Sequence, residues 1–187
     1  MSNVTINISA PLSKATIRSL DAGDQALITG TIYTARDAAH KRLAELITKG
    51  KKLPLDLQNQ IVYYTGPTPK NPQNNSFSAG PTTSSRMDAY TPLLLEKTGL
   101  SAIIGKGNRT PPVVDALKKN IAVYFAADGG CGAMLGACIK QSTLVCWDDL
   151  GPEAIYRFTV ENFPVVVAID CKGNNLYETG PVRFKKS

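Results

Sequence analysis

Apolar residues recur along the chain in two patterns that alternate with each other. Short runs rich in β-branched residues, such as 26–33, have the composition of β-strands. Longer stretches, such as 35–49, repeat apolar residues like Ala39 and Leu43 at the spacing of one helix face. Strands that alternate with helices in this way predict an α/β domain in which at least part of the sheet is parallel.

The same patterns give a full set of expected elements. The predicted strands are 4–8, 26–33, 61–65, 100–104, 121–126, 144–147, 154–160 and 164–169. The predicted helices are 13–20, 35–49, one from 82 or 83 to 90, 92–99, 112–119 and 132–139. After Asp170 we expect a turn and one short strand. Strands near both ends of the chain follow one another without a helix between them, which predicts some antiparallel pairing and therefore a mixed sheet.

Length and composition favour one domain that covers residues 1–187. With 187 residues, 43% of them apolar and 19% charged, the chain can bury a core of its own. The first residues carry no secretion signal and no apolar run is long enough to span a membrane, so we expect a cytoplasmic protein without a membrane partner. The net charge of +6 comes from basic residues spread along the chain. No nucleic-acid-binding motif accompanies them, so no nucleic-acid partner is expected.

Cysteine and histidine spacing gives no sign of a metal site in this chain. The cysteines are Cys131, Cys138, Cys146 and Cys171, and His40 is the only histidine. No Cys-x-x-Cys pair is present, and neither is the run of close cysteines that holds many iron–sulfur clusters. We therefore expect reduced thiols and no metal bound by this chain, so the ligands of any cluster must come from elsewhere.

Loops that lead from a predicted strand into a predicted helix carry the candidate chemistry. Such junctions lie at residues 31–36, 79–86, 105–109 and 128–132. The carboxyl ends of strands are the usual ligand site of open α/β sheets, and helix N-termini attract anions. Because three of these loops also carry a cationic side chain, the sequence predicts an anionic ligand.

The first loop, Thr34-Ala-Arg-Asp37, has the spacing of a capping box with Thr34 as the expected cap. Arg36 then falls in the first helical turn, where a positive charge opposes the helix dipole. Two interpretations are open: Arg36 binds a carboxylate with its guanidinium fork, or it pairs with Asp37 or another acid. His40 lies one turn further along the same face, and as a lone histidine it is expected to orient a neighbour.

The second loop runs from Gly80 to Asp88 and places several hydroxyls ahead of an arginine. Gly80 permits close backbone approach, and the hydroxyls of Thr82 and Thr83 can contact an anion. A hydroxyl serves as a proton carrier only where positive charge stabilises its alkoxide form, and Arg86 can supply that charge one turn after Thr82. The plainer alternative is a helix cap rich in serine and threonine.

The remaining loops are rich in glycine. Ile104-Gly-Lys-Gly-Asn-Arg109 lacks the Walker spacing of a nucleotide-binding loop, but Lys106 between its two glycines can still reach an anion. Asp128-Gly-Gly-Cys-Gly132 either packs closely against a ligand or partner, or forms a plain turn.

Taken together, these loops resemble those of the class I, iron–sulfur fumarases and L-tartrate dehydratases. The matching stretches are 34–40, 80–88 and 104–109, and the resemblance covers about residues 23–177. In that family this region is either a separate beta subunit or the C-terminal half of a fused chain. Residues 151–156, 162–164 and 170–174 are similar to the fumarase branch, while Cys131 stands where small apolar residues are more usual.

The resemblance implies a swivelling three-layer β/β/α fold and a larger alpha subunit that holds a 4Fe–4S cluster by three cysteines. This chain would bind no cofactor and would assemble with that subunit, two of each, to add or remove water on a small four-carbon dicarboxylate. By position, Thr82 corresponds to the catalytic base, with Arg86 beside it in the catalytic set. Arg36, Arg86 and Lys106 correspond to substrate-binding cations, and Lys106 would also stabilise the alkoxide form of Thr82. The residues expected to support the site are Asp37, His40, Gly80 and Thr83.

Three functions stay open on the sequence. The first is the beta subunit of a fumarate hydratase that is active only with its alpha subunit. The second is the beta subunit of an L(+)-tartrate dehydratase, which the sequence pattern separates poorly from the first. The third belongs to another class: a stand-alone anion-binding or regulatory domain that has the pocket without catalysis.

Overall fold

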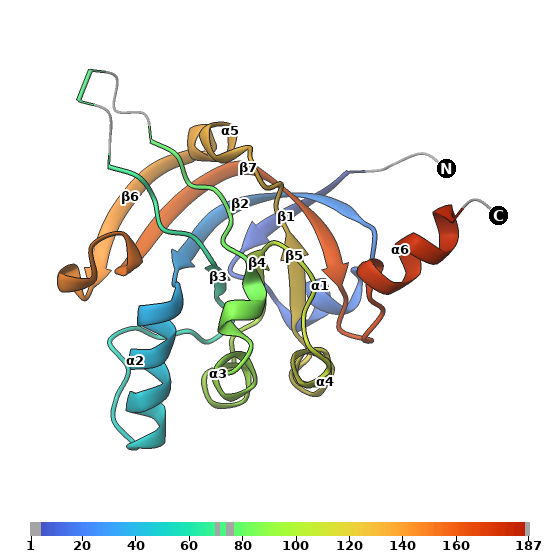
Figure 1. Cartoon of the computed structure of the whole chain (residues 1–187), viewed down its shortest axis with the longest axis horizontal. Helices are drawn as coiled ribbons and strands as arrows, with labels where there is room; N and C mark the ends of the chain where they lie inside the picture. Colours follow the sequence, from blue (N-terminus) through green and yellow to red (C-terminus); the bar gives the residue numbers. More distant parts are fainter. Residues whose placement is uncertain (1–4, 70–71, 74–76, 186–187) are drawn as a thin grey trace.

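The computed structural model describes residues 5–69, 72–73 and 77–185, without the side chains of residues 183 and 184 (Figure 1). The first residue of the predicted strand 4–8 lies outside this range, as do parts of the long loop 66–78. No helix in the described ranges combines the length and the apolar character needed to cross a membrane.

The described chain contains strands and helices in the alternation that the sequence predicts. The strands are β1 (Ile6–Ala10), β2 (Gln25–Thr34), β3 (Ile61–Tyr63), β4 (Ala102–Gly105), β5 (Val123–Ala126), β6 (Ile139–Cys146) and β7 (Ile155–Ile169). The α-helices are α1 (Lys14–Arg18), α2 (Asp37–Thr48), α3 (Thr91–Thr98), α4 (Pro111–Asn120), α5 (Gly132–Ala137) and α6 (Leu176–Phe184). Two short 3₁₀-helices are η1 (Ser84–Met87) and η2 (Asp148–Glu153).

The strands form one mixed sheet, which confirms the predicted α/β class. Strands β1 to β5 pair in parallel, whereas β7 pairs antiparallel with β2, β5 and β6. The order is β1-β2-β3-β4-β5-β7-β6, with an additional pairing between β2 and β7. This pairing closes a ring of hydrogen-bonded strands through β2, β3, β4, β5 and β7. In Figure 1, β2, β6 and β7 lie on the side of the molecule opposite α2, α3 and α4.

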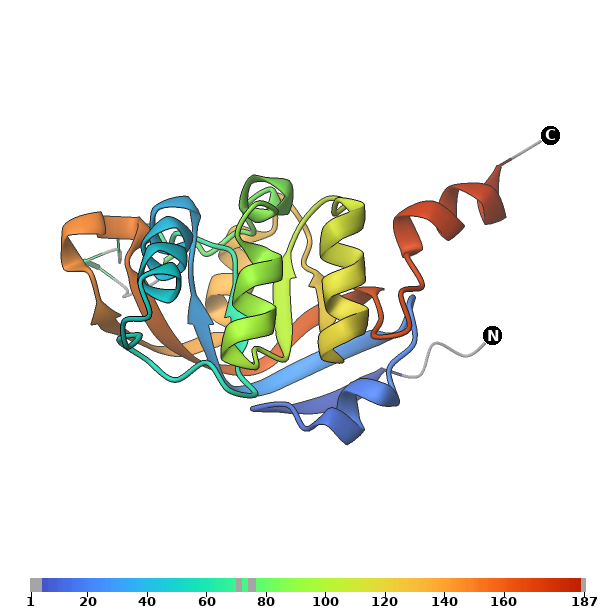
Figure 2. The same ribbon diagram turned by 90° about the horizontal axis from the view of Figure 1, so that it is seen from below.

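The central strands are covered on both faces, because successive side chains of a strand point to opposite sides. In β3, Ile61 and Tyr63 belong to one buried cluster and Val62 to another. The second cluster includes apolar residues of α2, α3 and α4, and Figure 2 shows these helices side by side along one face of the sheet. The short, wholly apolar runs of β3 to β5 therefore reflect burial on both sides.

Strand β7 corrects the prediction of two strands separated at residues 161–163. It is a single strand of 15 residues, and Asn162 lies within it at a φ of 51°. The register with β2 shifts between Ile28 and Gly30, which marks a bulge, and the Asn162 amide donates to the Thr29 hydroxyl at 3.1 Å. Asparagine tolerates a positive φ better than most residues, so the strand bends here without ending.

Three further segments differ from the sequence prediction. Strand β6 begins at Ile139, the last residue of the predicted helix 132–139, and extends through most of the predicted strand 144–147. The helix expected from residue 82 or 83 to 90 is reduced to η1, because the residues before it are hydrogen-bonded to neighbouring strands and stay extended. The tail after Asp170 makes only an isolated bridge between Ile169 and Asn175, and then forms helix α6 in place of the expected strand. The Asn175 side chain caps α6 by accepting from the Tyr177 amide at 3.1 Å.

Candidate functional site

The candidate residues gather at one edge of the sheet. Arg36 follows β2, Thr82 lies on the segment that follows β3, and Lys106 comes directly after β4. Because these three strands are parallel, their carboxyl ends meet at the same edge. The loops that carry these residues therefore lie at one edge of the sheet, at the place where open α/β sheets usually bind ligands.

Backbone hydrogen bonds bring the Thr82 segment alongside the end of β4. The Thr82 amide donates to the Tyr64 carbonyl at 2.7 Å, and Thr83 forms a parallel bridge with Lys106. One residue further, the Ser84 amide donates to the Lys106 carbonyl at 2.9 Å, and the Lys106 amide donates to the Ser84 hydroxyl at 3.1 Å. This ladder fixes Thr82 and Lys106 on adjacent backbone segments, which explains why no regular helix begins at residue 82.

Within the described residues, the functional groups of Thr82 and Lys106 are without partners. Both side chains are half-buried, the Thr82 hydroxyl makes no hydrogen bond there, and the Lys106 ammonium forms no ion pair there. The stem of Lys106 lies over Gly129, where an added Cβ would come within 3.4 Å of the lysine Cδ. Lys106 thus packs along the Gly129 backbone, and within the described residues a hydroxyl and a cation remain available to a ligand.

Arg109, the other cation of this loop, points inward and anchors the loop. Its side chain is fully buried, its Nε donates to Asp88 Oδ1 at 2.7 Å, and its guanidinium lies 4.9 Å from the ring centre of Tyr124. The Tyr124 hydroxyl lies 2.8 Å from the Gly107 carbonyl and 3.0 Å from Ser84 Oγ. This buried network holds the backbone on both sides of Lys106. The sequence alone did not distinguish the outward lysine from the inward arginine.

Arg36 and Arg86 meet at Asp37. Arg86 Nε donates to Asp37 Oδ1 at 2.8 Å, and Arg36 Nη2 lies 3.8 Å from Asp37 Oδ2. The ion pair proposed as the alternative role of Arg36 therefore exists. Yet neither terminal nitrogen of Arg86 or of Arg36 makes a hydrogen bond in the part of the chain described. Asp37 holds the two guanidiniums near each other and leaves those donors for a carboxylate.

The predicted capping box is wrong. Arg36, not Thr34, is the N-cap residue of α2, and its side chain makes no capping hydrogen bond. Thr34 is the last residue of β2, and its hydroxyl lies 3.3 Å from the Ala154 carbonyl and accepts from the Tyr156 amide at 2.9 Å. The helix is capped instead by Glu153, whose Oε2 accepts from the Ala38 amide at 2.8 Å. Thr34 lies next to the start of β7 because β2 and β7 pair. The local sequence does not reveal this pairing.

His40 is buried beneath the arginines. Its Nδ1 lies 2.9 Å from the Arg36 carbonyl, and its ring packs at right angles to Tyr64 with the centroids 4.7 Å apart. Burial lowers the pKa of His40 to about 4, so the ring is neutral at physiological pH and donates from Nδ1. This contact fits the orienting role expected from the sequence, since it fixes the backbone of Arg36.

His40 makes a testable contribution to stability. The pKa lies below its ordinary value of 6.5 in the folded protein, so acid protonates the unfolded chain first and weakens folding as the pH falls from 6.5 toward 4. We expect the free energy of unfolding to drop by about 2 kcal/mol between pH 7 and pH 5 from this residue alone. Urea denaturation at the two pH values measures it. The His40→Asn variant should lose most of the drop, and an equal drop in both proteins would contradict the assignment.

Gly80 lies where the chain passes closest to the start of α5. An added Cβ on Gly132 would come within 3.1 Å of the Gly80 amide nitrogen, and the Thr65 hydroxyl donates to the Gly80 carbonyl at 2.8 Å. The loop at 128–132 therefore packs against the Thr82 segment as well as against Lys106. Cys131 within it is half-buried and precedes α5 as its N-cap residue.

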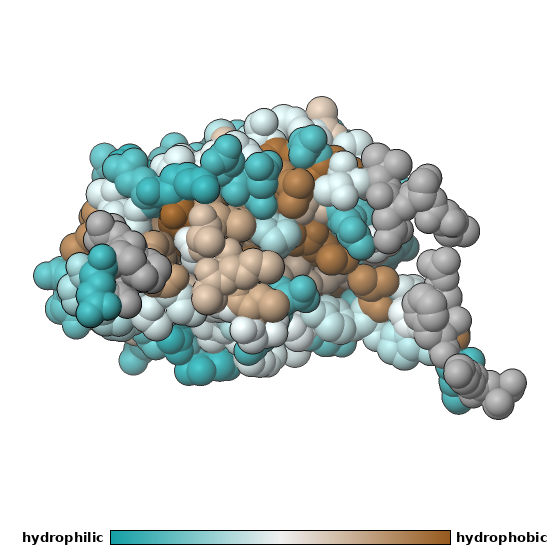
Figure 3. All heavy atoms as spheres, turned by 90° about the horizontal axis from the view of Figure 1, so that it is seen from above, coloured by the Kyte–Doolittle hydropathy of each residue, from teal (hydrophilic) through white to brown (hydrophobic). Residues whose placement is uncertain are grey.

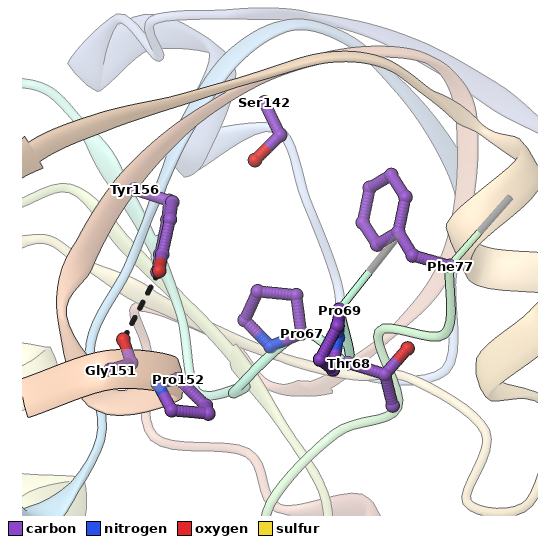
Figure 4. Close-up of a pocket in the computed structure, with 8 residues that line it drawn as sticks. All are labelled: Pro67, Thr68, Pro69, Phe77, Ser142, Gly151, Pro152 and Tyr156. Atoms are coloured by element: carbon purple, nitrogen blue, oxygen red, sulfur yellow. Dashed lines mark hydrogen bonds between the residues drawn. The ribbon is translucent and has the colours of Figure 1, made fainter. Parts of the chain in front are cut away.

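A cavity of about 390 Å³ opens beside this edge (Figure 4). It has a largely apolar wall, and none of its lining residues is charged. They are Pro67, Thr68, Pro69, Phe77, Ser142, Gly151, Pro152 and Tyr156. The cavity adjoins Arg36, because an added Cβ on Gly66 would come within 3.0 Å of Arg36 Nη1 and 2.9 Å of the Pro152 carbonyl. The candidate residues thus lie at an open edge next to the cavity and do not line it.

An apolar surface covers part of the face with α5 and β6. Met134 of α5 and Leu144 of β6 are 50% and 40% exposed. Figure 3 views the molecule from this side and shows apolar residues gathered near the middle of the face, with hydrophilic residues along its border. Exposed apolar surface bordered by polar residues is typical of contact with another protein.

Among the described residues, the side chains that bind metals are scattered. In the described residues no three histidine, cysteine or acidic side chains come together as a group that could hold an ion. All the cysteines are free and half-buried. A cluster site built on three cysteines therefore cannot be assembled from the described part of this chain.

Fold and site together define an α/β protein with a cationic, hydroxyl-bearing edge suited to a small anion. The chain belongs to the family described as Fumarase C-terminus, whose model matches residues 1–180, and this confirms the resemblance seen in the sequence. The putative L(+)-tartrate dehydratase subunit beta of Methanocaldococcus jannaschii is 40% identical over 173 residues, covering 89% of this chain and 88% of that protein.

Fumarate hydratases are similar to the chain over a smaller share of their own length. Fumarate hydratase 2 of Leishmania major is 36% identical over 180 residues, covering 94% of this chain and 31% of that protein. The anaerobic class I fumarate hydratase of Escherichia coli K12 is 36% identical over 178 residues, with 94% and 32% covered. The chain therefore spans about a third of the length of these fumarate hydratases.

Proposed function

We propose that this chain is the beta subunit of a 4Fe–4S-dependent hydro-lyase that interconverts fumarate and L-malate. One observation carries the proposal: Thr82 and Lys106 lie with unpaired functional groups at the same sheet edge as the arginine pair. A dianionic substrate needs cations that are held in place but keep free hydrogen-bond donors. A proton transfer needs a hydroxyl with positive charge nearby. This edge offers both.

The roles follow from the positions of the groups. Arg36 and Arg86 bind a substrate carboxylate with their free terminal nitrogens, and Asp37 keeps the pair together. Lys106 binds carboxylate or hydroxyl and stabilises the alkoxide form of Thr82. In dehydration Thr82, in its alkoxide form, takes the proton from a substrate carbon, while the hydroxyl leaves the neighbouring carbon as water with a proton from the donor opposite Thr82. Hydration reverses these steps, and the substrate undergoes no net oxidation or reduction.

The cluster and the proton donor opposite Thr82 belong, in this proposal, to an alpha subunit. The misfit of this chain's cysteines to a cluster supports that division. The apolar face around α5 and β6 supports the need for a protein partner. We further propose an assembly with two copies of each subunit, a cytoplasmic location, and one swivelling three-layer domain. Helices on one side of β3 to β5 and the β2–β7 pairing on the other side support the layering.

A second candidate function is L(+)-tartrate dehydratase, with oxaloacetate as the product. It is favoured by the similarity to the tartrate dehydratase subunit beta, which spans nearly the whole of both chains. The same cations and the same threonine would serve either substrate.

Reconstitution of the two-subunit enzyme tests the proposal. The chain is purified anaerobically alone and with its presumed alpha partner, iron and sulfide are added, and fumarate loss and malate formation are followed with an L-tartrate assay in parallel. We expect fumarate turnover in the mixture only, with iron on the partner only. Tartrate turnover alone would change the substrate and leave the roles. No turnover by a mixture with an intact cluster would favour the stand-alone anion-binding domain.

A further inference from the structure

Arg36 occupies a position that by itself is unfavourable. It is the N-cap residue of α2, where a cation opposes the helix dipole, and it contributes no capping hydrogen bond. Its side chain is 24% exposed, so it is largely removed from the water that would otherwise screen it. Asp37, the next residue, compensates part of this charge, with 3.8 Å between its Oδ2 and Arg36 Nη2, and a closer compensating charge comes from elsewhere in the fold.

Glu153 supplies that compensation from a distant part of the chain. It is the last residue of η2, and its two carboxylate oxygens have different partners. Oε2 accepts from the Ala38 amide in the first turn of α2 at 2.8 Å, while Oε1 lies 3.4 Å from Arg36 Nη2. One carboxylate thus caps the helix and sets the place of the guanidinium at its start.

The backbone around Glu153 is fixed on both sides. Before it, the Tyr156 hydroxyl donates to the Gly151 carbonyl at 3.1 Å, a contact drawn in Figure 4. After it, Ala154 and Tyr156 are joined to the Thr34 hydroxyl at the end of β2. The position of Glu153 therefore depends on the pairing of β2 with β7, which also positions the loop that carries Arg36.

Glu153 contacts Arg36 without occupying its donors. The contact at 3.4 Å is an ion pair, and the Arg36 terminal nitrogens make no hydrogen bond to any described residue. From the other side the guanidinium is confined by Gly66, where an added Cβ would come within 3.0 Å of Nη1. A guanidinium confined in this way loses little further freedom when a carboxylate binds.

We infer that Glu153 is a positioning residue that aligns Arg36 for a substrate carboxylate, and this inference rests on the proposed function. Glu153 itself does not touch the substrate. Its effect is exerted through Arg36 and should appear in substrate binding more than in the chemical step.

The Glu153→Gln variant in the assembled two-subunit enzyme tests the inference. Glutamine keeps an oxygen that can accept from the Ala38 amide, so α2 stays capped, but it removes the charge that holds Arg36. We expect KM for the dicarboxylate to rise about tenfold while kcat changes less than about threefold, because the interaction lost is made equally in the ground state and the transition state. Arg36→Met is measured beside it.

Asp149→Asn is the matched control. Asp149 lies in the same segment η2, before its kink at Gly151, and pairs with Arg42 of the same α2, at 2.9 Å between Oδ1 and Nη1, but this contact is exposed and lies outside the site. The KM of the Asp149→Asn enzyme should stay unchanged. A second readout avoids activity altogether: in the chain alone, the ¹⁵N heteronuclear NOE of the Arg36 Nε–H group should fall in Glu153→Gln and not in Asp149→Asn.

The outcomes separate the inference from the proposed function. If Arg36→Met raises KM but Glu153→Gln does not, Glu153 is only a helix cap and the inference fails while the function stands. A fall in KM in Glu153→Gln would make Glu153 a competing counter-ion and would also overturn the inference. If Arg36→Met leaves KM unchanged, the role of Arg36 fails first and the inference fails with it.

Discussion

Replacing Thr82 with alanine should lower kcat of the assembled enzyme about 10³-fold, the usual contribution of a positioned proton-transfer group. The Thr82 amide, not its side chain, makes the hydrogen bond to Tyr64 that fixes the segment. The hydroxyl is without a hydrogen-bond partner within the described residues, so its loss leaves no buried group unsatisfied. KM and the melting temperature should therefore change little.

Ser85→Ala is the matched control for this experiment. Ser85 lies three residues further in the same hydroxyl-rich stretch, but its side chain is exposed, and we expect turnover to be unchanged. Thr82→Ser keeps a hydroxyl and should retain part of the activity. Full turnover in Thr82→Ala would remove Thr82 from the mechanism and leave the catalytic base to the partner subunit.

Replacing Arg36 with methionine should raise KM for the dicarboxylate about 100-fold. A hydrogen-bonded contact between a guanidinium and a carboxylate contributes up to about 3 kcal/mol, and the substitution removes it while keeping an unbranched side chain against Gly66. The loss of a cation from the N-terminus of α2 is by itself favourable for the helix. Thermal unfolding should therefore show little loss of stability, which separates a binding defect from a folding defect.

Arg42→Met provides the comparison, because it removes the same charge from the next turns of the same helix. Arg42 pairs with Asp149 at the surface, and exposed ion pairs of this kind contribute less than about 1 kcal/mol. The KM of the Arg42→Met enzyme should match that of the unaltered enzyme. Equal KM values for Arg36→Met and Arg42→Met would show that the arginine pair at Asp37 is a surface ion pair without a part in binding.

Much of the fold followed from local patterns. Runs such as 26–33 and 121–126 became strands because β-branched and aromatic side chains fit a pleated sheet, which is buried mainly on one face in β2 and on both faces in β5. The alternation with helices determined that β2 to β5 are parallel, and hence that the loops after them meet at one edge. A cation or hydroxyl placed after each of these strands is brought to the same edge by topology alone, while the roles of these residues stay predictions.

The predictions that the structure contradicts depend on hydrogen-bond partners far away in the sequence. Thr34 has the spacing of a cap, yet its hydroxyl is used by Ala154 and Tyr156, which reach it only because β2 pairs with β7. Residues 82 and 83 directly precede the helical segment η1, yet backbone pairing with Tyr64 and Lys106 keeps them extended. In each case a local preference of about 1 kcal/mol gave way to several hydrogen bonds to neighbouring strands.

The sequence by itself thus determined the α/β class, the mixed sheet and the loops that carry the candidate residues, because hydrophobic periodicity and turn residues act over short distances. Only the tertiary structure decided how those residues are used. Arg109 turns inward because Asp88 and Tyr124 bind it, whereas the Lys106 ammonium forms no ion pair within the described residues. The capping and alignment of Arg36 by Glu153 join residues more than a hundred positions apart, a relation that exists only once β7 has paired with β2.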